Sequence, residues 1–111
     1  MLKKEFIIGG AGSGKTARLM SEAMSHIDTR IAYLGSNDRY KDFCSEWFRR
    51  YGKRCPIEFA EGGCTYETLV TDNLQDDIEN IPMQVLRCAV TDDFEVVWFA
   101  SINTDSCEMS V

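Results

Sequence analysis

The sequence predicts an α/β fold, a small three-layer sandwich around a mostly parallel β-sheet and minimal in size. Short apolar runs typical of buried strands alternate with longer segments whose apolar residues recur every three to four positions, as on a helix. Strands separated by helices pair in parallel, because each helix carries the chain back to the starting end of the sheet. A length of 111 residues allows one domain. We place it at residues 1–104, followed by a tail at 105–111.

Each predicted element rests on a local pattern. Phe6-Ile7-Ile8 is an apolar run that indicates a buried strand, and apolar residues at helical spacing from Ala17 to Ile27 predict the helix that follows. Pro82 opens a later helical run, and proline is tolerated in the first turn of a helix. The expected strands are 6–8, 30–34, 57–60, 66–70 and 94–100, and the expected helices begin near 14, span 38–51 and run from 82 to about 90.

The last third of the chain allows a second interpretation. Residues 85–90 would form a strand, and Asp92 and Asp93 would then be candidate magnesium ligands, although the apolar spacing favours a helix. Residues 94–100 are apolar on both faces after Glu95, which indicates a central, buried strand. Polar residues follow its expected end, on the ligand side of a parallel sheet: Ser101, Asn103 and Thr104.

A glycine-rich loop stands between the first strand and the first helix. Residues 9–16 fit the phosphate-binding pattern G-x-x-x-x-G-K-[ST] at every fixed position. Such a loop turns several backbone N–H groups toward a phosphate, and glycines allow the positive φ angles that this requires. The helix that follows would point its positive end at the same anion. The candidate nucleotide-binding residues are Gly9, Gly10, Ala11, Gly12, Ser13, Gly14, Lys15 and Thr16.

Two residue roles follow from this loop. Lys15 is the candidate catalytic residue, because its cation would lie on the β and γ phosphates of a nucleotide. Mg²⁺ would be held by the hydroxyl of Thr16 and by an acid at the end of a neighbouring strand, for which Asp72 is the candidate. Three glutamates are candidates for activating water: Glu58, Glu61 and Glu67.

Composition limits the other possibilities. The net charge is −6, yet residues 1–54 carry +5 and residues 55–111 carry −11, so anionic phosphates favour the first half and head-to-tail self-association is plausible on charge grounds. No apolar run approaches the length of a membrane span, and we expect a cytoplasmic protein without membrane contact. Five cysteines without a C-x-x-C pair argue against a disulfide framework or a zinc site.

The segment 38–54 combines an aromatic stripe with basic residues. The stripe is typical of a core-facing helix side, and the basic residues are typical of a solvated face. Alternatively, the segment contacts a partner protein or single-stranded nucleic acid. Arg49 and Arg50 are the residues that would reach a partner, or the nucleotide of a neighbouring subunit in a homo-oligomer.

The loop is similar to that of the P-loop NTPases. Within that group the chain weakly resembles the adenosylcobinamide kinase/guanylyltransferase family, which has a RecA-like fold. The resemblance lies in residues 9–16, Ile31-Ala32-Tyr33-Leu34-Gly35-Ser36, Arg54-Cys55-Pro56 and Leu69-Val70-Thr71-Asp72. It implies that Asp72 is the magnesium acid. Arg49 and Arg50 stand in the stretch where that family carries the histidine that takes up GMP.

The sequence therefore predicts a minimal P-loop NTPase that binds ATP or GTP with Mg²⁺ and hydrolyses it. The alternative is a non-catalytic nucleotide-binding or interaction protein that uses the segment 38–54. A small-molecule kinase is a third class, for which so short a chain leaves little room for an acceptor pocket.

Overall fold

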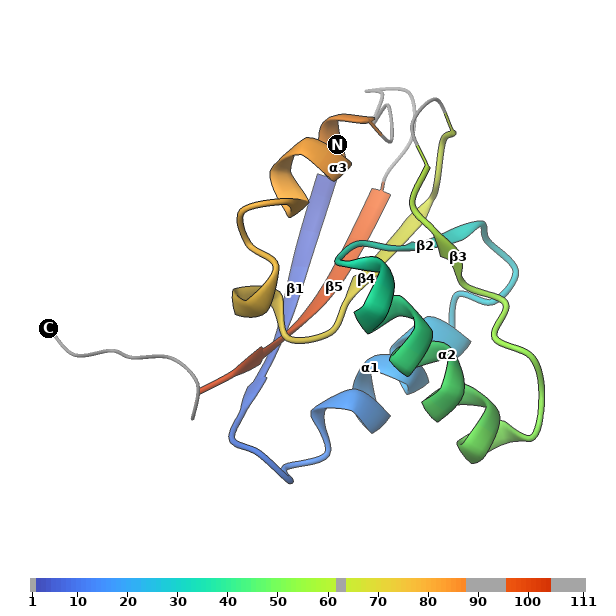
Figure 1. Cartoon of the computed structure of the whole chain (residues 1–111). Coiled ribbons are helices and arrows are strands. Elements are labelled where there is room, and N and C mark those ends of the chain that lie inside the picture. Colours follow the sequence, from blue (N-terminus) through green and yellow to red (C-terminus); the bar gives the residue numbers. More distant parts are fainter. Residues whose placement is uncertain (1, 62–63, 88–95, 105–111) are drawn as a thin grey trace, which may run out of the picture.

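The computed structural model describes residues 2–61, 64–87 and 96–104, which form a parallel sheet with helices on both faces (Figure 1). The predicted tail at 105–111 and the alternative acids Asp92 and Asp93 lie outside these residues. The elements in chain order are β1 (Leu2–Gly9), α1 (Lys15–Met24), β2 (Ile31–Tyr33), α2 (Asn37–Tyr51), β3 (Glu58–Phe59), β4 (Thr68–Thr71), the 3₁₀ turn η1 (Leu74–Asp76), α3 (Ile81–Arg87) and β5 (Val96–Asn103).

The five described strands pair in the order β1-β5-β4-β2-β3, and every pairing is parallel. The prediction of a mostly parallel sheet is therefore confirmed. The last strand in the chain, β5, lies between β1 and β4 and pairs with both. Because all five strands run in the same direction, their carboxyl ends meet along one edge of the sheet.

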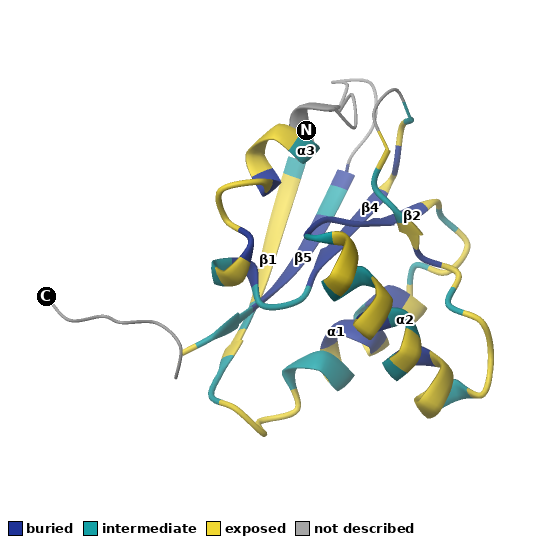
Figure 2. Cartoon of the chain, viewed as in Figure 1, coloured by how far each residue is buried: buried dark blue, intermediate teal, exposed yellow. Residues whose placement is uncertain are grey.

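Helices cover both faces of this sheet, which gives the expected sandwich. On one face, Leu19 of α1 and Phe43 and Trp47 of α2 pack in one core cluster with residues of β2, β4 and β5. On the other face, Leu74 of η1 and Ile81 of α3 belong to a second cluster with residues of the same strands. Burial is greatest along β2, β4 and β5 (Figure 2).

Helix α2 forms where the sequence predicts it. The Ser36 hydroxyl caps its start by accepting a hydrogen bond from the backbone N–H of Arg39, and Gly52 ends it in the left-handed conformation at φ 65°. Phe43 and Trp47 of the aromatic stripe are buried and face the core. Phe48, which the helical spacing also places on the stripe, is exposed. The core-facing interpretation is confirmed for Phe43 and Trp47 and is wrong for Phe48.

The prediction for the first strand is wrong in one respect. We expected a buried strand at 6–8, but β1 is an edge strand, and the side chains of Phe6 and Ile8 are 49% and 64% exposed. An apolar run indicates a strand but not its position in the sheet, because a neighbour on one side alone is enough to form it. Around its midpoint β1 pairs only with β5, with Phe6 opposite Ala100.

One further boundary differs from expectation. β5 extends to Asn103, so Ser101 lies within the strand and not beyond its end. Residues 81–87 are helical, which confirms the preferred helix and contradicts the alternative strand for the described part of 85–90. None of the helices in the described ranges has both the length and the apolar character needed to cross a bilayer.

We predict that Trp47→Ala lowers the free energy of unfolding by about 3–5 kcal/mol, because it removes a buried aromatic ring and leaves a cavity. Urea denaturation followed by circular dichroism measures the change. The matched control is Phe48→Ala on the adjacent, exposed position, for which a change within about 0.5 kcal/mol is expected. Equal losses in the two variants would contradict this packing of α2.

Candidate functional site

The carboxyl ends of β1, β5 and β4 bring three distant segments together. Gly9 is paired with Asn103, and Thr71 is paired with Ala100. The next position along these two central strands therefore places Asp72 beside Ser101. The glycine loop leaves β1 at the same edge, so the loop and Asp72 are brought together by strand pairing alone.

A short series of hydrogen bonds holds Asp72. The hydroxyl of Ser101 donates to Asp72 Oδ1 at 2.7 Å and accepts from the backbone N–H of Asn73 at 2.8 Å. The hydroxyl of Thr16 donates to Asp72 Oδ2 at 3.1 Å. The two candidate metal-binding residues, which are 56 positions apart in the chain, thus contact each other. Ser101 is the second hydroxyl that fixes the orientation of the carboxylate.

The backbone of the loop depends on glycine at particular positions. Gly14 caps α1 with a φ of 84°, and Gly12 has a φ of 76°, a region that other residues rarely adopt. At Gly9 a Cβ would overlap the hydroxyl of Ser13, so a larger residue there would force the Ser13 side chain to move. The backbone N–H of Ser13 turns back to the carbonyl of Gly10 at 3.2 Å. The loop is therefore a tight turn that leads directly into α1.

The start of α1 carries an excess of positive charge. No side chain caps this helix, and its first turn contains no acidic residue. Helix α2, in contrast, has a capping Ser36 and Asp38 in its first turn. Free N–H groups and the helix dipole make such an uncapped start attractive to anions. The ammonium of Lys15 adds a full positive charge and donates to the carbonyl of Gly10 at 2.7 Å, which holds it against the loop.

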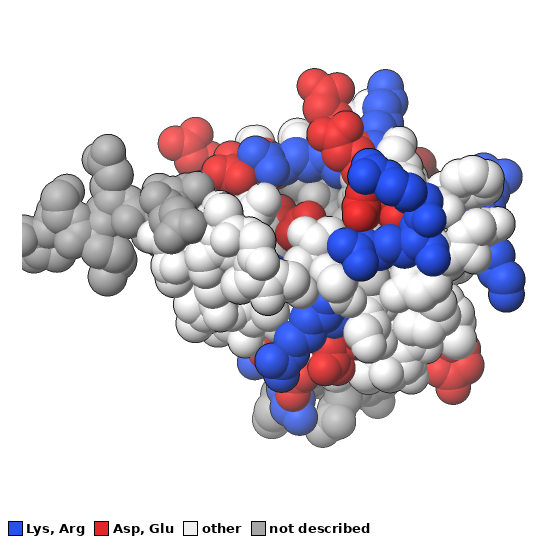
Figure 3. Space-filling model, turned by 90° about the horizontal axis from the view of Figure 1, so that it is seen from below, with Lys and Arg blue, Asp and Glu red and all other residues white. Residues whose placement is uncertain are grey.

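A pocket of about 450 Å³ opens beside Thr16 and Asp72. Its other wall is α2, which contributes both acidic and basic side chains. Figure 3 views the molecule from below, the side on which the loop lies in Figure 1, and shows basic side chains next to acidic ones on this face. The charged α2 residues that line the pocket are Arg39, Asp42, Glu46, Arg49 and Arg50.

Arg49 and Arg50 lie in the same chain's pocket as Thr16 and Asp72. We expected these arginines to reach a partner or a neighbouring subunit, but the fold already places them beside the loop of their own chain. Both form ion pairs with Glu46, each at 3.0 Å. Arg39 instead pairs with Asp76 at 2.7 Å and with the buried Asp77 at 3.4 Å, which links α2 to η1.

Tyr33 lies between the pocket and the core. Its side chain is fully buried, and its hydroxyl has no hydrogen-bond partner in the described part of the chain; the nearby backbone of Asp72 falls outside hydrogen-bonding geometry. Burial, and after it the negative charge of Asp72, raise the pKa of this hydroxyl above its ordinary value. The hydroxyl is therefore neutral and buried, and Tyr33 is one of the residues that line the pocket.

The three glutamates proposed as water activators do not line this pocket. Glu67 directly precedes β4, at the end of the strand opposite to Asp72. Glu58 forms two hydrogen bonds with Arg30, at 2.8 and 2.9 Å, and this guanidinium holds the pKa of Glu58 below its ordinary value. Glu61 follows β3 and lines a different pocket. Their positions along the sequence did not indicate whether these three glutamates lie near the loop.

Sequence reasoning missed four residues that the fold brings to the site. Tyr33 was placed in a strand without a role, and Asp42 and Glu46 were not singled out among the charges of the second helix. Ser101 was noted only as part of a polar string, yet it holds Asp72 directly. The Asp72–Ser101 contact follows from the parallel pairing of residues 71 and 100, a register that the structure supplies and no local sequence pattern encodes.

Comparison of the chain with protein-family models, curated proteins and solved structures found no match. The functional argument therefore rests on the geometry of the loop, Asp72 and the adjoining pocket.

We predict that Ser101→Ala lowers the free energy of unfolding by about 1–3 kcal/mol, because the N–H of Asn73 loses its acceptor and Asp72 loses a donor. Urea denaturation measures the loss. Ser25→Ala is the control, since its hydroxyl bonds the carbonyl of Ser21 at an exposed position and should matter far less. A Ser101→Ala variant as stable as this control would show that the network does not hold the strand ends.

Proposed function

We propose that the chain is a minimal P-loop protein that binds ATP or GTP with Mg²⁺ and hydrolyses the nucleotide. The observation that carries this proposal is the contact between Thr16 and Asp72 at 3.1 Å, at the mouth of a complete glycine-lysine-threonine loop. The P-loop pattern places the metal-binding hydroxyl at this threonine, and the second metal ligand is expected on a neighbouring strand. A loop of chance similarity would have no reason to face an acid held in this way.

The donor set fits a magnesium nucleotide. The hydroxyl of Thr16 and the carboxylate of Asp72 are oxygen ligands, and Mg²⁺ in phosphoryl-transfer sites takes one or two such protein ligands together with phosphate oxygens. When bound, the ion neutralises charge on the β and γ phosphates. The chain's own part is to fix these two oxygens in place, which the Ser101 hydroxyl does for Asp72.

The loop residues supply the phosphate contacts. The turn at Gly12 and Gly14 and the uncapped start of α1 offer backbone N–H groups. Lys15 is held against the loop and would exchange its bond to Gly10 for a phosphate oxygen. Its cation would stabilise the negative charge that develops on the transferred group. The carboxyl edge of a parallel sheet is where α/β proteins of this kind bind their ligands.

Measurement of phosphate release separates an enzyme from a nucleotide-binding protein. We expect slow but measurable turnover of Mg-ATP or Mg-GTP that depends on Lys15. Binding without any turnover would favour the non-catalytic alternative, in which the bound nucleotide controls contacts of segment 38–54 with a partner.

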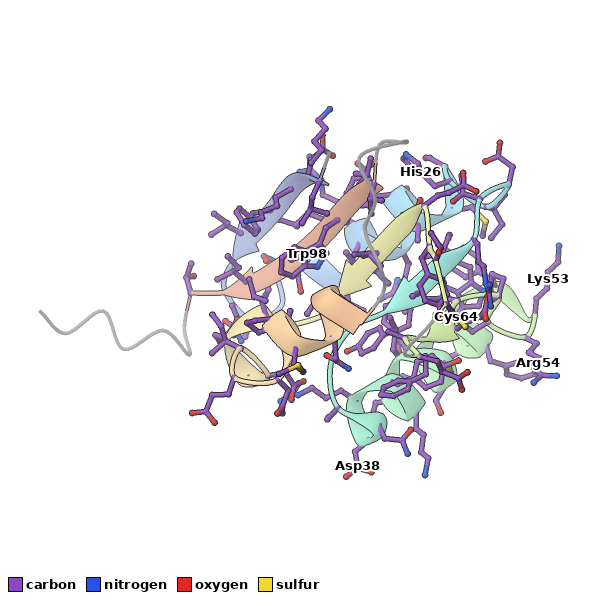
Figure 4. The ribbon with its side chains drawn as sticks, turned by 90° about the horizontal axis from the view of Figure 1, so that it is seen from above. His26, Asp38, Lys53, Arg54, Cys64 and Trp98 are labelled. Carbon is purple, nitrogen blue, oxygen red and sulfur yellow. The ribbon has the colours of Figure 1, made fainter. Side chains whose placement is uncertain are left out.

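We predict that Lys15→Ala weakens Mg-nucleotide binding by at least about 10-fold, because one charge-assisted hydrogen bond contributes roughly 1.5–3 kcal/mol. Isothermal titration calorimetry with non-hydrolysable ATP and GTP analogues measures the affinity. Lys53→Ala removes the same charge at an exposed position outside the loop, and Figure 4 shows Lys53 projecting away from the body of the molecule. An unchanged affinity in Lys15→Ala would overturn the proposed function.

We predict that Asp72→Asn removes most of the enhancement that Mg²⁺ gives to nucleotide binding, because a neutral amide is a poorer magnesium ligand than a carboxylate. Calorimetry with and without Mg²⁺ gives the enhancement in each variant. Asp28→Asn, at an exposed position after α1, should keep the full enhancement. If Asp72→Asn also keeps it, Asp72 is not a metal ligand.

A further inference from the structure

The pocket between the loop and α2 is larger than hydrolysis requires. A water molecule occupies roughly 30 Å³ of liquid volume, whereas this pocket has about 450 Å³, within the range of small-molecule sites. Thr16 and Asp72 form part of its wall, so whatever fills the pocket lies directly beside the proposed magnesium nucleotide.

Two guanidinium groups of the α2 wall meet at one carboxylate. Arg49 and Arg50 both pair with Glu46, and each guanidinium has further N–H donors beyond that contact. Asp42 is a second carboxylate on this wall, so these four side chains balance in charge, and the Asp72 carboxylate on the opposite wall is assigned to the metal ion. The side chains of Arg49 and Arg50 are 77% and 43% exposed, which leaves them free to turn toward a ligand. Guanidinium groups bind carboxylate and phosphate groups with two parallel hydrogen bonds.

A second, independent observation is the unpartnered donor of Tyr33. A buried hydroxyl without a hydrogen bond is costly, at roughly 1–3 kcal/mol, and proteins seldom retain one without a purpose. Tyr33 lines the same pocket as Arg49 and Arg50. A ligand with a polar group at this depth would give that hydroxyl an acceptor.

We propose that this pocket binds a small metabolite that carries a carboxylate or phosphate group, anchored by Arg49 and Arg50, and that a hydroxyl of this metabolite accepts the γ-phosphoryl group. The proposal rests on the proposed nucleotide binding. In the transfer, a bond forms between the acceptor oxygen and the γ-phosphorus, and the bond from that phosphorus to the β–γ bridging oxygen breaks. The nucleoside diphosphate leaves with the bonding electrons, and the hydroxyl proton passes to water.

The test uses methyl phosphate and acetate as minimal probes of the two anion classes. Nitrogen-15 NMR of the arginine Nε–H groups follows each titration at constant ionic strength, with the loop saturated with Mg-ADP. We expect saturable shifts of the Arg49 and Arg50 signals, with methyl phosphate the tighter probe for a phosphate ligand and acetate the tighter one for a carboxylate ligand. Arg49→Gln and Arg50→Gln should each weaken the probe at least about 10-fold, the loss of one charge-assisted contact.

Arg54→Gln is the matched control, because it removes the same charge outside this pocket, and Figure 4 shows Arg54 projecting outward beyond α2. Probe shifts that are absent throughout the titration, or losses as large in Arg54→Gln as in the pocket variants, would overturn the proposal. Calorimetry of the wild-type chain with Mg-ADP keeps the two proposals apart. Nucleotide binding without probe binding rejects the acceptor pocket alone, whereas failure of nucleotide binding rejects the proposed function and the acceptor role together.

Discussion

The parallel pairing of β5 with both β1 and β4 is the constraint on which the site depends. It places the end of β1, and with it the glycine loop, one strand away from the end of β4, where Asp72 stands. Side chains strengthen the same pairing. The indole N–H of Trp98 donates to the hydroxyl of Thr71 at 2.9 Å inside the sheet, and Ser101 bonds Asp72 one step further along. The strand register therefore determines the geometry of the site.

Charge is distributed around that arrangement in two layers. The uncapped start of α1 and Lys15 present positive charge to the space above the loop, and the Asp72 carboxylate faces it from the neighbouring strand. Helix α2 adds the second layer, in which Glu46 is shared by Arg49 and Arg50. The proposed magnesium nucleotide fits this arrangement, since its phosphates would meet Lys15 and the start of α1 and its metal ion would meet Asp72. The pocket volume is one basis for the proposal that a second small molecule binds beside it.

Local patterns predicted the helix ends well where a glycine marked them in the sequence. Gly52 ends α2, and Gly14 precedes α1, because both glycines adopt the left-handed conformation at a helix end. The position of β1 did not follow, because an apolar run is compatible with a central or an edge strand. Glu67, one of the glutamates proposed as bases, lies far from Asp72 for a related reason. It precedes β4 and Asp72 follows it, and residues before and after a strand lie at opposite edges of the sheet.

The sequence by itself determined the phosphate-loop pattern, the alternation of strands and helices and the choice of Asp72, because these depend on residue type at short spacing. The tertiary structure decided which residues accompany the loop. Tyr33, Ser101 and the arginines of α2 reach it through strand order and helix packing, which are set by contacts between segments far apart in the chain. No local pattern encodes such contacts, since each depends on how the sheet is ordered. The same packing formed a pocket that the length of the chain gave no reason to expect.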